Sequence, residues 1–106
     1  MNNDLKLIEQ RIDEQFQRKS RTMYWLEVVD DVYDQTYNFF MCHQKKGEPL
    51  RSVPLHSLTD HDLASLETII AALQHYTQLT IHYFGFVGQE WPGSHRIIQK
   101  KRHGEE

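Results

Sequence analysis

The sequence predicts an α+β fold, in which an N-terminal helix, an antiparallel β-meander and a central helix are followed by a C-terminal strand or hairpin. Residues 58–77 repeat apolar side chains at three- and four-residue steps, which is the period of a helix. Residues 22–43 are rich in Tyr, Trp, Val, Thr and Phe and hold one leucine and no alanine, a composition typical of strands.

Residues 4–19 predict an amphipathic helix that begins with Asn2, Asn3 or Asp4 as its cap. The residues of its apolar stripe are Leu5, Ile8, Ile12 and Phe16. Most helical stripes face the core of their own domain, and we expect the same here. Because this stripe is narrow, it also suits a seam between two copies, so a homodimer is the alternative.

In the next stretch we predict a strand at 23–29 and its antiparallel partner at 36–43. Residues 30–35 are the predicted turn between them, because residues of these types tolerate tight backbone bends. A third short strand is predicted at 50–55. Its prolines at positions 49 and 54 confine it to a sheet edge or make it irregular. In this arrangement the meander buries Trp25, Phe39 and Met41 under the two helices.

A competing interpretation makes residues 22–46 helical, because polar residues between Glu27 and Asn38 fall at helical spacing. The whole chain would then be an all-α bundle. Its helices would span residues 4–20, 22–46 and 59–84.

The clearest helix of the sequence lies within residues 58–77. Thr59 is the expected cap, with Asp60 and Asp62 in the first turn, where acidic side chains complement the positive helix end. The residues expected on its apolar stripe are Leu63, Leu66, Ile69, Ile70, Leu73, Tyr76 and Thr77. Residues 79–87 then predict a strand, or a continuation of the helix up to Gly85, and a WPG turn follows.

Length and composition indicate one domain, which we place at residues 1–95, with a basic tail at 96–106. The net charge of −3 is too small to make the whole molecule a polyanion binder. One cysteine, Cys42, excludes an internal disulfide framework. No apolar leader or membrane-spanning run is present in the sequence. We therefore expect a cytoplasmic protein without membrane contact.

Catalytic patterns are weak in this sequence. Cys42 lies among apolar neighbours, which is typical of a buried thiol, and no glycine-rich phosphate loop is present. Seven histidines invite a metal hypothesis, with His75 and His82 as candidate ligands, but the ligand spacing of a complete tetrahedral set is missing. We expect no enzyme activity, no metal and no cofactor.

An acidic run is the strongest functional signal. Its members are Glu27, Asp30, Asp31 and Asp34. No lysine or arginine occurs between Thr22 and Gln44, and aromatic side chains surround the run. Because complementary charge steers association and aromatic side chains anchor interfaces, the run predicts a protein-docking surface. We expect a small interaction protein, such as an adaptor, an inhibitor, an immunity protein or an accessory regulator.

The alternative function is nucleic-acid binding through the basic tail and nearby aromatics. The cations of the tail are Arg96, Lys100, Lys101 and Arg102. The predicted α-β-β-β-α order also resembles double-stranded RNA-binding domains. Those domains carry a basic cluster at the start of the second helix, where this chain reads TDHD at 59–62. That mode of RNA binding is therefore not expected.

Overall fold

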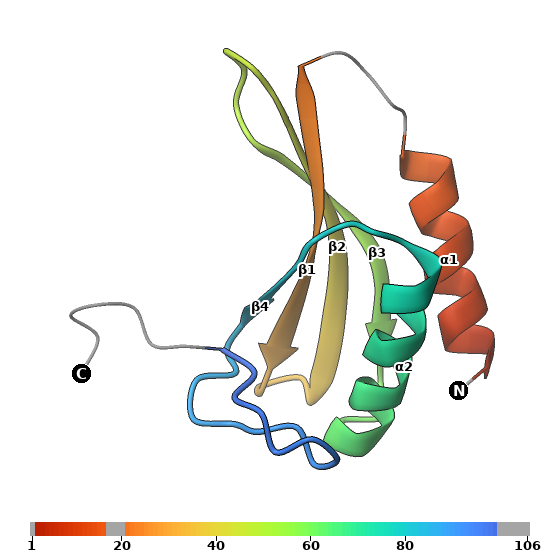
Figure 1. The fold of residues 1–106 in the computed structure, drawn as a ribbon, viewed down its shortest axis with the longest axis vertical. Helices are drawn as coiled ribbons and strands as arrows, with labels where there is room; N and C mark the ends of the chain where they lie inside the picture. The colour runs from red at the N-terminus through yellow and green to blue at the C-terminus, as the bar shows by residue number, and fades with distance from the viewer. Residues whose placement is uncertain (1, 17–20, 100–106) are drawn as a thin grey trace.

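A computed structural model of the chain, which describes residues 2–16 and 21–99, confirms the α+β fold (Figure 1). The all-α alternative is excluded, because residues 22–46, which it assigned to one helix, contain two strands and the turn between them. The elements are α1 (Asn2–Gln15), β1 (Thr22–Asp31), β2 (Thr36–Lys45), β3 (Arg51–Leu58), α2 (Leu63–Tyr76) and β4 (Ile81–Phe84).

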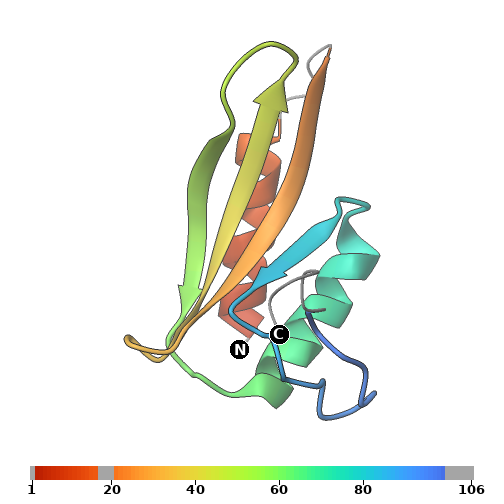
Figure 2. The ribbon, with the colours of Figure 1, turned by 90° about the vertical axis from the view of Figure 1, so that its left-hand side faces the viewer.

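The four strands form one mixed sheet in the order β3-β2-β1-β4. The predicted meander is present, since β1 pairs with β2 and β2 with β3 in antiparallel fashion. The chain then crosses over through α2, so β4 returns parallel to β1. Both helices lie on the same face of the sheet (Figure 1), and Figure 2 looks onto the opposite face, where no helix crosses the strands.

The core lies between the helices and the even-numbered side chains of β1. Leu26 and Val28 are fully buried there, in one hydrophobic cluster with α2 residues such as Leu66. Phe39 and Met41 are buried as predicted. The prediction for Trp25 is wrong, because side chains alternate along a strand and its neighbour Leu26 occupies the helix-covered face.

The stripe of α1 packs within the protein. Ile8 and Ile12 belong to the core, and Leu5 and Phe16 pack against it. At one end of the helix the Tyr76 hydroxyl of α2 donates to the Asp13 carboxylate. The stripe is therefore occupied by the core of the same chain and presents no exposed seam. The predicted end of this helix, at 17–19, lies outside the described residues.

The central helix begins four residues later than its predicted cap. Leu58 still belongs to β3, so residues 59–62 serve as the connection and Asp62 becomes the cap. Its carboxylate accepts from the Ser65 backbone amide at 3.2 Å and from the Ser65 hydroxyl at 2.8 Å. These bonds lower the pKa of Asp62. Of the predicted stripe, Leu66, Ile69, Ile70 and Leu73 are buried, and Leu63 and the C-cap Thr77 are partly buried. The prediction is wrong for Tyr76, which is 43% exposed.

The last strand is shorter than predicted because Gly85 ends it. The glycine has φ +85°, and a Cβ there would lie 2.9 Å from the Asp30 carbonyl oxygen. Only glycine combines that backbone angle with so close an approach. The chain therefore turns away from the sheet directly after β4.

Residues 85–99 form a strap that packs onto the end of the sheet and the start of α2. Phe86 and Ile98 belong to the core, and the Glu67 carboxylate accepts from the amides of Gly93 and Ser94 at 2.8 and 3.3 Å. The expected domain end at residue 95 falls inside this strap, since Ile98 is 8% exposed. Within the described residues, no helix is both long and apolar enough to span a bilayer.

Candidate interaction surface

The register of the strands places one set of side chains on the face of the sheet that the helices leave uncovered. Trp25 pairs with Cys42, Glu27 with Phe40, and Val29 with Asn38, so each pair points to this face. On the other side of β1, Glu27 pairs with His82 and Val29 with Phe84. We call this surface the open face. Its principal residues are Trp25, Glu27, Val29, Asp31, Asn38, Phe40, His82 and Phe84.

Aromatic rings occupy the middle of the open face. Trp25, Phe40 and Phe84 are each partly exposed. The indole Nε1 of Trp25 donates to Glu27 Oε2 at 3.3 Å, and the indole ring lies 6.2 Å from the His82 ring, centre to centre. The hydrogen bond orients the indole. The face therefore presents three partly exposed aromatic rings, with carboxylate and imidazole groups beside them.

Cys42 lies on the same face but is not accessible. It is fully buried between its strand neighbours Trp25 and Ser52, and its thiol donates to the Ser52 hydroxyl at 3.6 Å. Burial raises the pKa of Cys42 to about 11. The thiol is therefore protonated at neutral pH, as expected of a buried small side chain.

The β1–β2 turn extends the open face at one end. Asp31 Oδ1 accepts from the backbone amides of Tyr33 and Asp34, each at 3.1 Å, which fixes the turn. Gln35 has a left-handed φ of 57° before β2 begins. The ring of Tyr33 is 94% exposed and Asp34 is exposed beside it. The turn therefore holds an exposed aromatic ring between two carboxylates.

Asp30 is separated from the other members of the acidic run. Its side chain points to the helix-covered face and is 8% exposed. Its carboxylate lies 2.6 Å from His61 Nε2 and accepts from Gln89 Nε2 at 2.8 Å. The His61 ring stacks on Tyr37 at 4.4 Å. Asp30 thus ties the end of β1 to the start of α2 and to the strap, and it takes no part in the open face.

The Asp30–His61 pair has the arrangement of a carboxylate that orients an imidazole. Among the described residues, however, no serine, threonine or cysteine hydrogen-bonds to His61, so the pair has no nucleophile to activate. Burial, with the charges of Asp30, Asp62 and Asp60 nearby, raises the pKa of Tyr37 to about 12. The observed role of the cluster is to join three segments.

The remaining predicted sites are dispersed. Arg96 is exposed on the strap, whereas Lys100, Lys101 and Arg102 lie outside the described residues. His75 is exposed in the last turn of α2 and His82 lies on the open face. In the part of the chain that the structure describes, no three His, Cys, Asp or Glu side chains are grouped to hold a metal.

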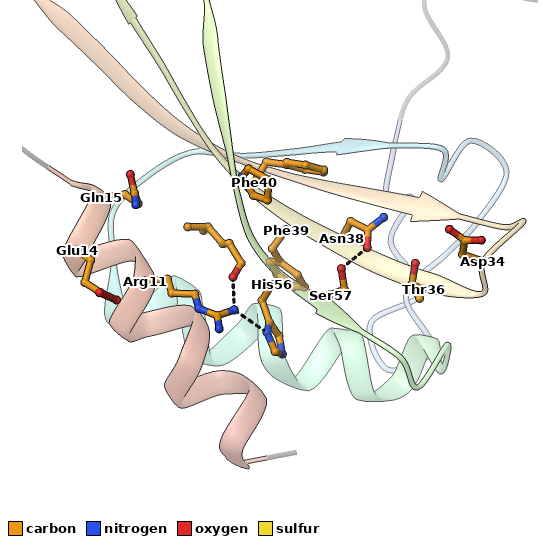
Figure 3. A pocket seen from close by; sticks show the side chains of 12 residues that line it. Arg11, Glu14, Gln15, Asp34, Thr36, Asn38, Phe39, Phe40, His56 and Ser57 are labelled. Carbon is orange, nitrogen blue, oxygen red and sulfur yellow. Dashed lines mark hydrogen bonds between the residues drawn. The ribbon is translucent and has the colours of Figure 1, made fainter.

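A groove of about 820 Å³ follows β3 around the edge of the open face (Figure 3). Phe40 and Asn38 line it from the open face, and Arg11 and Glu14 line it from α1. Asp34 lies at its far end. Sequence reasoning missed this groove, because it depends on where α1 docks relative to the edge strand. We call it the β3 groove.

Comparisons of the chain with protein-family models, with curated proteins and with solved structures found no match.

Proposed function

We propose that this protein is a non-catalytic docking protein that binds a protein partner through the open face and the β1–β2 turn. Adaptor, inhibitor, immunity and accessory regulatory roles all share this mode of action. The observation that carries the proposal is a helix-free sheet face that presents aromatic rings and carboxylates. At the positions of the four described strands that point to this face, there is no lysine or arginine.

The aromatic side chains supply the apolar anchors. Tyr33 is 94% exposed, and Trp25, Phe40 and Phe84 are partly exposed on a rigid sheet. Tyrosine and tryptophan are enriched at the energetic centres of protein interfaces, because they bury a large area and lose little rotamer freedom. A surface of this kind favours a macromolecular partner with its own apolar patch.

The carboxylates supply the charge preference. Glu27 and Asp31 lie on the open face and Asp34 stands beside it. Such a surface attracts a cationic protein and repels the phosphates of a nucleic acid. We therefore favour a protein partner with basic side chains around an apolar patch.

A matched pair of substitutions tests the proposal. Val29→Lys places a cation in the middle of the open face, and its partly exposed position lets the lysine chain reach solvent. Val87→Lys makes the same chemical change at an exposed position of the strap, outside the open face. Each variant and the wild type is immobilised and used to capture partners from a lysate of the native host, with and without nuclease.

We expect the wild type and Val87→Lys to recover the same protein after nuclease treatment, and Val29→Lys to recover at least about tenfold less, because a like charge in an interface is costly. Equal recovery by Val29→Lys would remove the open face from the proposal. Recovery that nuclease abolishes would support the nucleic-acid alternative instead.

A further inference from the structure

The β3 groove continues the docking surface around the sheet edge, and its chemistry specifies what part of a partner it receives. It runs along β3 between α1 and the β1–β2 turn (Figure 3). Phe40 lines both the groove and the open face. A partner that covers the open face therefore has a direct path into the groove.

The walls of the groove are held in place by a chain of hydrogen bonds. The Arg11 guanidinium donates to the Leu55 carbonyl and lies 3.1 Å from His56 Nδ1. His56 Nε2 lies 2.7 Å from Asp4 Oδ1. Because Nδ1 accepts from Arg11, Nε2 carries the ring proton and donates to Asp4. The network fixes α1 against the edge strand and holds the guanidinium of Arg11 at the groove wall.

The two ends of the groove carry carboxylates that the protein itself leaves unpaired. Glu14 and Asp34 are both exposed. In the described part of the chain, neither carboxylate has a hydrogen-bond or ion-pair partner. Among the described residues that line the groove, the one arginine is Arg11, which is bonded to β3, and there is no lysine. The groove therefore has a negative potential at both ends.

The middle of the groove is suited to an extended backbone. The Ser57 hydroxyl donates to Asn38 Oδ1 at 2.7 Å, which leaves the Asn38 amide hydrogens available as donors to a carbonyl. Phe40 and Pro54 add apolar surface beside them. A groove that follows an edge strand, with amide donors in the middle, matches the shape and polarity of a peptide segment.

We propose that the β3 groove binds an extended segment of the protein partner that carries two lysine or arginine side chains, one facing Glu14 and the other facing Asp34. This inference rests on the proposed docking function and names the chemistry of the partner. The open face supplies apolar contact, whereas the groove selects a dibasic segment. Specificity then depends on the spacing of the two cations.

The test uses a phage library of random 12-residue peptides selected on biotinylated full-length protein. Enriched peptides are synthesised and their affinities measured by fluorescence anisotropy against wild type, Glu14→Lys, Asp34→Lys and Glu90→Lys. Glu90 is a carboxylate on the strap, outside the groove, so Glu90→Lys controls for the same change in net charge. Denaturation curves confirm that each substitution leaves the fold intact.

We expect the enriched peptides to carry two basic residues, and each groove variant to weaken binding by about tenfold while Glu90→Lys stays within about twofold of wild type. Enrichment of peptides without paired basic residues, no enrichment, or equal affinity for the groove variants would overturn the proposal. A synthetic peptide of residues 96–106 is measured in parallel. If it binds as tightly as the selected peptides, the occupant is this chain's own basic segment and the partner assignment falls.

The two proposals fail separately. If Val29→Lys abolishes capture of the native partner but Glu14→Lys and Asp34→Lys do not, the open face is the docking site and the groove is not part of it. If dibasic peptides bind the groove but Val29→Lys captures the partner normally, the peptide site stands and docking through the open face is contradicted.

Discussion

Neighbouring residues of the acidic run serve opposite purposes. Asp30 is buried and bonded to His61 and Gln89, whereas Asp34 is exposed without a side-chain partner among the described residues. Because side chains alternate along β1, Asp30 faces the helices and Asp31 faces away. A run of like charges in the sequence therefore contains one buried residue, Asp30, and three residues on the surface.

We predict that Asp30→Ala lowers the free energy of unfolding by about 3 kcal/mol, because it removes the partner of His61 and leaves Gln89 with the Gly85 carbonyl alone. Asp34→Ala removes the same group from an exposed position and should change that free energy by less than about 0.5 kcal/mol. Urea denaturation measures both values. Equal effects would show that the Asp30 contacts contribute little to stability.

Cys42 gives a second prediction, on thiol reactivity. With a pKa of about 11, roughly one thiol in a thousand is ionised at pH 8, and the group is also fully buried. We expect labelling by Ellman's reagent to be at least about a hundredfold slower in the native protein than in urea. Similar rates in both conditions would contradict the buried, protonated thiol.

At the scale of elements, the end of β4 depends on the contact between Gly85 and the carbonyl of Asp30. Gly47 offers a matched control, since its φ of +84° is almost the same as the +85° of Gly85, and a Cβ added there would meet no atom within 4 Å. Alanine at either site costs about the same backbone strain. Of these two sites, Gly85 is the one where the new methyl group also meets a backbone oxygen.

We therefore predict that Gly85→Ala is more destabilising than Gly47→Ala by about 1–3 kcal/mol, which is the usual cost of overpacking. Thermal and urea denaturation of the two variants measure the difference. If the two alanines cost the same, the approach of Asp30 to Gly85 does not constrain the strand end.

The sequence was informative where local composition decides the element. Aromatic and β-branched residues in 22–43 predicted the hairpin, and apolar spacing predicted α2. The alternation of Leu26 and Val28 with Trp25 was a usable signal that the indole faces away from the core. The parallel return of β4 was not predictable, because it depends on how the crossover packs α2 onto the sheet.

The same division applies to the candidate site. The acidic and aromatic character of 27–34 was evident from the sequence, and the exposure of Tyr33 agrees with a surface turn. The bonds from Asp30 to residues 31 and 59 positions away were not accessible to local reasoning. The β3 groove, likewise, exists only after α1 has packed against β3.

At the scale of the whole molecule, the two ends of the β1–β2 hairpin carry opposite charge. The far end of the β1–β2 hairpin carries Arg21, Lys45 and Lys46, whereas the turn at the opposite end carries Asp31 and Asp34. A field of this kind orients a charged partner during approach, and salt weakens it. In the proposed function, a basic partner meets the acidic end of the open face first.

The most direct test of the docking surface is NMR chemical-shift mapping. The captured partner is added to this protein labelled with ¹⁵N, and the changes in its backbone amide signals are measured. We predict that partner addition shifts the amide signals of Val29, Phe40 and Phe84 and of the β1–β2 turn, while the amides on the solvent-facing side of α2 remain unchanged. Shifts confined to α2, with the open-face amides unaffected, would contradict the proposed mode of binding.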